Sequence, residues 1–203
     1  MIGGWHQSPE KASYFYRLFR LPGQDSFTQI NFGNYLSLLI LDTSHAHEVT
    51  GIQTRFVKSA MRKSKKFPHR FAIYHATAYP SHRKYGKKIS RLIRKNWCPL
   101  FEKYHLHAAF EHHEHSYKRT PPISNEAIDE NGVIYIGDGA WGAAPRSVHS
   151  IETTWYLAHA ASVQHCVMVS INEEQRLYEA YDVSGKIIDS YKQVIHPYND
   201  TFN

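Results

Sequence analysis

Short apolar runs alternate along the first half of the chain with longer segments whose apolar residues recur every three or four positions. Three apolar runs predict buried strands, at residues 35–41, 71–74 and 106–110. The periodic segments predict helices with one buried face, at residues 52–64 and 89–97. Pro99 should kink or restart the second helix. The order strand, helix, strand, helix, strand predicts an α/β (α+β) fold with a parallel sheet.

Strand patterns dominate the remaining segments. Residues 28–32 alternate between polar and apolar positions and precede Gly33-Asn34, a pair suited to a hairpin turn. Residues 133–136 predict a strand that leads into the glycine-rich segment 137–142. Three later runs predict an antiparallel meander, at residues 164–171, 176–183 and 186–191. Before residue 28 we expect only turns, at 8–10 and 21–23.

Length and composition indicate one globular domain. The chain has 203 residues, of which 42% are hydrophobic and 14% aromatic, enough for a sizeable core. No apolar run approaches the ~18 residues that span a bilayer, and the N-terminus shows no signal peptide, so we expect no membrane partner. We expect Cys98 and Cys166 to be two independent buried thiols.

The formal net charge is +6, and basic residues concentrate at 55–70 and 83–95. A basic protein favours polyanionic partners, including phosphate esters and nucleic acid. The alternative is that these residues form solvated helix faces, and we favour it for most of them. Because no nucleic-acid motif and no aromatic interleaving occur, we expect no specific nucleic-acid partner.

Histidines follow two of the predicted strands. His113 and His115 come after strand 106–110, and in an extended segment both imidazoles would point the same way and could bind metal. The alternative is a histidine-rich surface loop without metal. His75 follows strand 71–74 directly, and His82 lies seven residues further on. A parallel sheet would bring the ends of these two strands side by side.

Other histidines give weaker signals. His45 and His47 repeat the one-residue spacing after Asp42, but their loop is longer and we interpret them as structural. His105 and His107 lie at the opposite end of strand 106–110, so we expect them at the surface.

Several segments together resemble a known family. Residues 112–120 resemble the Gly-His-x-His-x-Tyr-x-Arg motif of purple acid phosphatase-like metallophosphoesterases, which belong to the calcineurin-like superfamily. Residues 72–82 are similar to the family's strand with a metal-binding histidine and a later substrate-facing one. Residues 39–45 with Gln53, and residues 132–142, look like further family segments. The match runs in family order over roughly residues 13–190.

The resemblance implies a fold, a function and a set of site residues. The fold is a four-layer α-β-β-α sandwich, of which residues 1–203 would be the C-terminal part, with the metal-site region at 13–160 and closing antiparallel strands at 161–195. The function is metal-dependent hydrolysis of phosphoric esters, as in acid phosphatases, with iron, zinc or manganese. His75 and His113 would bind one metal and His115 the other. His82 would contact the substrate phosphate and act as the catalytic proton donor.

Two departures from the family pattern change this expectation. The leading glycine of the motif is His112 here, at a position that could need unusual backbone freedom. The family's early Asp, Gly-Asp and Gly-Asn-His motifs are absent, and residues 1–11 resemble the family segment directly after the Gly-Asn-His motif. We therefore expect missing N-terminal strands, which would leave an exposed sheet edge and apolar surface.

The missing carboxylates also bear on activity. Three histidines without a bridging carboxylate could hold one ion but hardly two, so a dinuclear site requires the N-terminal half to be supplied. We expect the isolated chain to be inactive or weakly active. The alternative is a non-catalytic module that binds a single metal or depends on a partner chain, possibly the missing half. Because members of this family are often exported, a periplasmic or extracellular location is expected.

Overall fold

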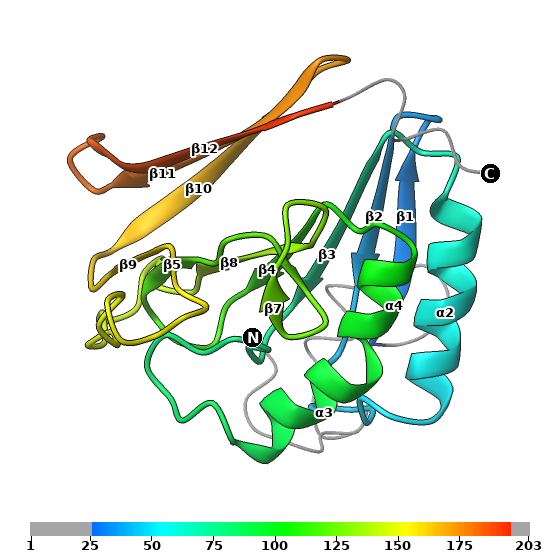
Figure 1. The fold of residues 1–203 in the computed structure, drawn as a ribbon, viewed down its shortest axis with the longest axis horizontal. Helices are drawn as coiled ribbons and strands as arrows, with labels where there is room; N and C mark the ends of the chain where they lie inside the picture. Colours follow the sequence, from blue (N-terminus) through cyan, green and yellow to red (C-terminus); the bar gives the residue numbers. More distant parts are fainter. Residues whose placement is uncertain (1–25, 196–203) are drawn as a thin grey trace.

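A mixed seven-stranded sheet forms the centre of the molecule in the computed structural model, which describes residues 26–195 (Figure 1). Its order is β1-β2-β3-β4-β8-β5-β9. The strands are β1 (Thr28–Phe32), β2 (Leu36–Ile40), β3 (His69–Tyr74), β4 (Ala108–Glu111), β8 (Ile134–Asp138), β5 (Tyr117–Arg119) and β9 (His159–Ala161). The four central strands, β2, β3, β4 and β8, run parallel, so their carboxyl ends meet at one edge.

Three helices cover one face of this sheet: α2 (Ile52–Ser64), α3 (Lys88–Asn96) and α4 (Cys98–Lys103). Their apolar stripes insert Val57, Met61, Ile93 and Phe101 into one buried cluster. Pro99 lies in the first turn of α4, where its missing N–H breaks no helical hydrogen bond, so the helix restarts there as predicted.

A second sheet covers the opposite face at one end. It is the predicted antiparallel meander of β10 (His165–Ile171), β11 (Gln175–Asp182) and β12 (Ile187–Val194). Tyr178 of β11 lies with its ring centroid 6.2 Å from that of Phe71 and 6.4 Å from that of Phe110. The two-stranded hairpin of β6 (Ile123–Ser124) and β7 (Ala127–Ile128) completes the described strands.

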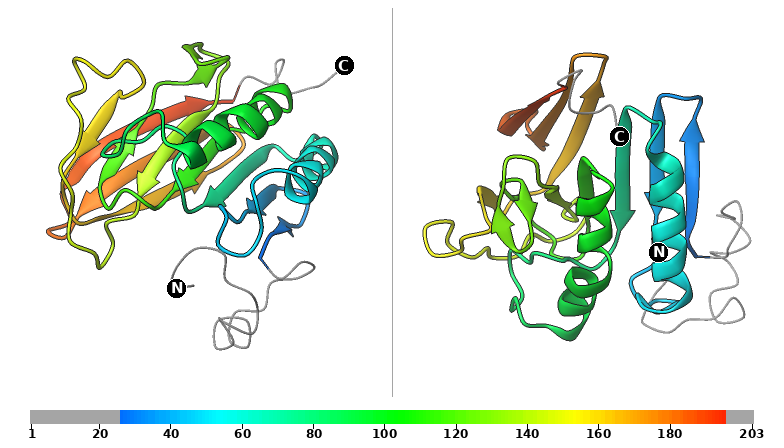
Figure 2. Two further views of the ribbon diagram at one scale, coloured as in Figure 1. Left: turned by 90° about the horizontal axis from the view of Figure 1, so that it is seen from below. Right: turned by 45° about the vertical axis from the view of Figure 1, so that its right-hand side comes forward.

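Among residues 26–195, the second sheet is not seen over the edge of the large sheet that β1 forms. Figure 2 shows β10, β11 and β12 over one end and β1 and β2 at the other. Leu36 and Leu38 of β2 are half-buried and still pack against the core around Tyr178, whereas Phe32 of β1 is 53% exposed. In the described residues, helices cover one outer face only, so three layers of the expected four are seen.

Two expectations about single residues are wrong. Cys98 is buried as expected, but Cys166 is exposed because β10 turns it outward. His107 is buried rather than at the surface, and its Nδ1 and Nε2 each lie 3.0 Å from a nitrogen of buried Arg70. His107 is buried just before β4 because the guanidinium of Arg70, on the neighbouring strand β3, is itself buried and needs hydrogen-bond partners.

The turns expected at residues 8–10 and 21–23 lie outside the described residues. In the described part, no helix combines the length and the apolar character that a membrane span needs.

Candidate active site

The parallel pairing of β3 and β4 brings His75 and His113 together, as the sequence predicts. Tyr74 pairs with Glu111, so the residues that follow each strand start from neighbouring positions. The backbone N–H groups of His112 and His113 both donate to the carbonyl oxygen of His75, at 3.0 and 2.9 Å. His113 Nδ1 lies 2.8 Å from His75 Nε2.

Both imidazoles of this pair are neutral at physiological pH. Burial, together with the neighbouring His113 and His45, lowers the pKa of His75 to about 3. Burial and the nearby Arg83 lower the pKa of His113 to about 4. Neutral imidazole is the form that donates a lone pair to a metal ion, so the environment holds both rings in a ligand-competent state.

The spacing of the pair suits two ligands of one ion. Two nitrogens bound at ~2.0–2.1 Å to the same metal lie roughly 2.9–3.4 Å apart, close to the 2.8 Å observed between His75 and His113. Within residues 26–195, however, no group of three or more His, Cys, Asp or Glu side chains is arranged to hold a metal ion. The described residues therefore supply two imidazoles and do not by themselves complete a metal centre.

His45, which we interpreted as a structural residue, also lies at this cluster, with its Nδ1 3.2 Å from Asp42 Oδ1. Its ring lies edge-on to His75, with centroids 5.0 Å apart. Asp42 holds the loop by accepting the N–H groups of His45, Ala46 and His47 at 2.9, 2.6 and 2.5 Å. The available signal was that His45 follows β2, which is the parallel neighbour of β3.

His47 does behave as the structural residue that we expected. Its Nδ1 lies 2.6 Å from Ser26 Oγ, and its ring lies edge-on to Phe27.

His115 does not sit in an extended segment. Its φ of 52° is left-handed and belongs to a turn, so the assumption that His113 and His115 project alike from a strand is wrong. Its imidazole nevertheless lies near enough to lower the pKa of both His75 and His113. A role for His115 in metal binding stays a prediction.

The replacement of the motif's glycine by His112 is accommodated on the neighbouring loop. His112 has an ordinary negative φ, so it needs no special backbone freedom. Instead, Gly139 packs directly against it, because a Cβ atom at Gly139 would lie 1.6 Å from the His112 carbonyl oxygen. The His112 side chain also pairs with Asp138.

Glu114 joins the His113 loop to the segment that carries His82. It is 1% exposed, and its Oε2 accepts the backbone N–H groups of His82 and Arg83 at 2.6 and 2.8 Å. Its Oε1 accepts from the Arg83 guanidinium at 2.8 Å. Burial alone would raise the pKa of Glu114, but these bonds lower it below its usual value, so the carboxylate is ionised.

The His82 ring is oriented by Ser147, whereas Glu114 holds the His82 backbone. Its Nδ1 lies 2.8 Å from the carbonyl oxygen of Ser147, so Nδ1–H donates to that oxygen. The same loop is tied to the site by Arg146, whose N–H donates to the His115 carbonyl at 2.9 Å. The catalytic and substrate-binding role of His82 stays a prediction.

A buried ion pair stiffens the strand ends beneath the histidines. Glu111 and Lys118 are both fully buried and paired. Glu111 Oε1 also accepts from the Tyr74 hydroxyl at 2.8 Å and from the Ala78 N–H at 2.6 Å. The carboxylate thereby holds the Tyr74 side chain before His75 and the Ala78 backbone after it.

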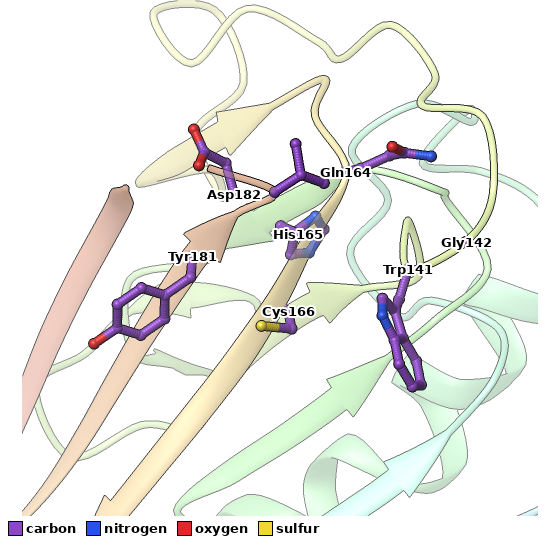
Figure 3. A pocket seen from close by; sticks show the side chains of 8 residues that line it. Trp141, Gly142, Gln164, His165, Cys166, Tyr181 and Asp182 are labelled. Carbon is purple, nitrogen blue, oxygen red and sulfur yellow. The ribbon is translucent and has the colours of Figure 1, made fainter. Parts of the chain in front are cut away.

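Beyond the Gly139 loop lies a shallow cavity of 260 Å³ (Figure 3). Trp141, Cys166 and Tyr181 are among its lining residues, and Trp141 is 85% exposed. None of the candidate histidines lines this cavity.

Comparison with known proteins gives matches in structure only. No known family profile matches the sequence, and no curated protein matches it significantly. A purple acid phosphatase from yellow lupin (Lupinus luteus) seeds matches with a TM-score of 0.72 and 20% identity, over 86% of this chain and 34% of that one. This chain has part of the fold of a purple acid phosphatase.

Two further structures share this purple acid phosphatase-like fold. One is GAP50 of Plasmodium, described as the anchor in the inner membrane complex, with a TM-score of 0.62 and 12% identity over 84% of this chain and 53% of that one. The other is PhoD, with a TM-score of 0.60 and 9% identity over 93% of this chain and 47% of that one. The chain thus spans about a third of the lupin protein and about half of the other two. The predicted fold is confirmed as part of a larger architecture.

Proposed function

We propose that the chain is part of a metal-dependent phosphoric ester hydrolase of the acid phosphatase kind. The observation that carries the proposal is the His75–His113 pair, two neutral imidazoles 2.8 Å apart at the carboxyl ends of adjacent parallel strands. In a fold shared with a purple acid phosphatase and PhoD, this edge is where a metal would be expected. Iron, zinc or manganese bound there would supply the positive charge that a phosphate ester needs for hydrolysis.

Groups of the chain itself support phosphate chemistry. Burial, Arg146 and Arg83 lower the pKa of His115, and the positive charge of Arg146 would attract a phosphate dianion, whereas that of Arg83 is paired with Glu114. His82, held by Glu114 and Ser147, would in its protonated form donate a proton to the leaving oxygen. The substrate class is therefore phosphate esters.

The remaining metal ligands would come from outside residues 26–195 or from a separate chain. Because the described residues bring no carboxylate to the pair, we expect one metal ion per chain and weak or no turnover by the chain alone. A dinuclear centre and full activity would follow only when the N-terminal half of the family fold is supplied.

Metal and phosphate binding by the whole chain test this proposal. We expect it to bind one Zn²⁺, and inorganic phosphate to bind only to the metal-loaded form. His75→Asn and His113→Asn should each weaken Zn²⁺ binding at least ~10-fold, since even the loss of a residue that supports a ligand costs that much. His105→Asn is the matched control, because His105 is exposed and its φ of 51° suits Asn.

Chelator competition gives the zinc affinities, and calorimetry gives phosphate binding. Equal zinc affinities for His113→Asn and His105→Asn would overturn the assignment of the pair. Zinc binding through the pair without any phosphate binding or aryl phosphate hydrolysis, even with the N-terminal half added, would instead identify a non-catalytic metal-binding module.

A further inference from the structure

A cavity of 540 Å³ lies between the loop that joins β2 to α2 and the beginning of α3. This volume falls within the range of small-molecule sites in proteins, roughly 300–1,000 Å³. Neither the proposed metal pair nor His82 lines it. The cavity is therefore distinct from the metal site in its lining residues.

Its position links it to the histidine cluster. Ser44 lines the cavity and directly precedes His45, whose ring contacts that of His75. Ser44 is fixed by a φ of 71° and by its N–H, which donates to the His47 carbonyl at 3.1 Å. The loop that carries Ser44 and His45 thus connects the cavity to the histidine pair, with Ser44 on the cavity and the His45 ring on His75.

The lining combines an apolar floor with charged rims. Ile89 and Leu92 are half-buried, pack against the main core and offer the floor. Lys87 and Lys88 are exposed at the beginning of α3, where the first turn carries no acidic residue. Within residues 26–195, no ion pair neutralises either lysine.

Glu48 is the one acidic group of the lining. Its Oε2 accepts a 3.2 Å hydrogen bond from the Thr50 hydroxyl, which also lines the cavity. The ionised side chains of Glu48, Lys87 and Lys88 together leave the lining positively charged. An apolar floor under an excess of positive charge favours a ligand with an apolar body and an anionic group.

We propose that this cavity binds the alcohol portion of the phosphate ester and selects an apolar alcohol that carries a further negative charge. This inference rests on the proposed function, because that function places the phosphate next to His45 and His75. The apolar body would lie on Ile89 and Leu92, and its anionic group would face Lys87 and Lys88.

Naphthalene-1-sulfonate serves as the probe, with neutral naphthalene-1-sulfonamide as its matched analogue. Binding to the ¹⁵N-labelled whole chain in the presence of a chelator should shift the amide resonances of Lys88 and Ile89. The Lys87→Gln/Lys88→Gln variant should raise the Kd of the sulfonate roughly three- to tenfold, the effect of removing two partly solvated charge contacts. Glu48→Gln should lower it, because a repulsive charge is removed.

Lys58→Gln/Lys63→Gln is the control, since both residues are exposed on α2, outside the lining, and the change in charge is equal. This control should change the Kd of the sulfonate less than twofold. The neutral sulfonamide should bind more weakly than the sulfonate, and its Kd should not depend on Lys87 and Lys88. Shifts confined to other surfaces, or equal effects of the two double variants, would overturn the proposal. The sulfonate titration contains a chelator and therefore does not depend on metal binding. A failure of zinc or phosphate binding would contradict the proposed function without changing the measured affinity of the cavity for the sulfonate.

Discussion

At the residue scale, the position of one carbonyl oxygen decides how the histidine loop is held. The His112 carbonyl lies against Gly139, and this contact leaves no room for a side chain. The glycine at this contact is Gly139, on the segment that faces His112. The close approach of the two loops therefore involves the His112 backbone, and the His112 side chain is left to pair with Asp138.

Gly139→Ala should therefore disturb the histidine loop. Its Cβ would meet the His112 oxygen at 1.6 Å, so the backbone must shift, at a cost of about 1–3 kcal/mol by analogy with overpacked cores. Urea unfolding measures this cost, and zinc binding reports the displacement of His113. Gly86→Ala is the control, because a Cβ there meets nothing within 4 Å. An equally small effect at both glycines would show that the two loops do not touch.

At the scale of elements, parallel pairing explains what the sequence could and could not predict. The helices and the longer apolar strands were predictable because their apolar spacing reflects which face is buried, and helix 52–64 agrees with α2 at both ends. The short strands β5, β6, β7 and β9 were not predicted, because two or three residues carry no readable period. His75 and His113 were predictable because parallel strand ends converge. His45 was not, because its position depends on the Asp42 turn, whose hydrogen bonds leave no apolar pattern.

The turn at His115 and the burial of His107 were missed for a related reason. Both depend on a partner from elsewhere in the chain: Arg146 for the His115 carbonyl and Arg70 for His107. Hydrophobic periodicity records burial along one element and carries no information about such polar partners.

Glu114 gives the prediction that belongs to this scale. The Glu114→Gln variant replaces an ionised acceptor by an amide that can accept through one atom only, so one buried N–H or the Arg83 guanidinium loses its partner. We expect a loss of about 1–3 kcal/mol in the free energy of unfolding. We also expect the amide resonances of His82 and Arg83 to shift, because their hydrogen bonds to the Glu114 side chain are weakened.

Glu173→Gln provides the comparison, since Glu173 is exposed and far in sequence from Glu114 and its partners. It should change stability by less than ~0.5 kcal/mol, as surface substitutions usually do. If Glu114→Gln proved as neutral as Glu173→Gln, then the two loops would be held together by other contacts, such as the 2.9 Å bond between Ser81 Oγ and Ser116 Oγ.

At the scale of the whole molecule, the two sheets are joined by a polar contact as well as by the apolar layer around Tyr178. Asp189 of β12 accepts from Arg119 Nε at 2.6 Å and from the Tyr117 hydroxyl at 2.7 Å, both on β5. Tyr117 and Arg119 belong to the motif that also contains the histidines. The contact therefore connects the closing sheet to the segment that carries the candidate site.

Asp189 makes this connection sensitive to acid. Burial raises the pKa of its carboxyl, but the hydrogen bonds from Arg119 and Tyr117 outweigh burial and lower it below the ordinary 3.8. A carboxyl whose pKa is lower in the folded state stabilises the fold above its unfolded pKa, and that contribution disappears as the pH falls through the folded value. At neutral pH, Asp189→Asn should cost about 1–3 kcal/mol, because Arg119 loses its charged partner.

The difference in unfolding free energy between wild type and Asp189→Asn should thus be largest above pH ~4 and shrink as the pH falls below the ordinary 3.8. Urea unfolding at several pH values measures it, with Asp129→Asn in an exposed turn as the control. A difference that stayed constant from neutral to strongly acidic pH would mean that Asp189 acts by shape rather than charge. The remaining contacts between the sheets, such as the packing around Tyr178 and the 3.0 Å bond between Arg176 Nε and His69 Nδ1, would then be the ones that hold them together.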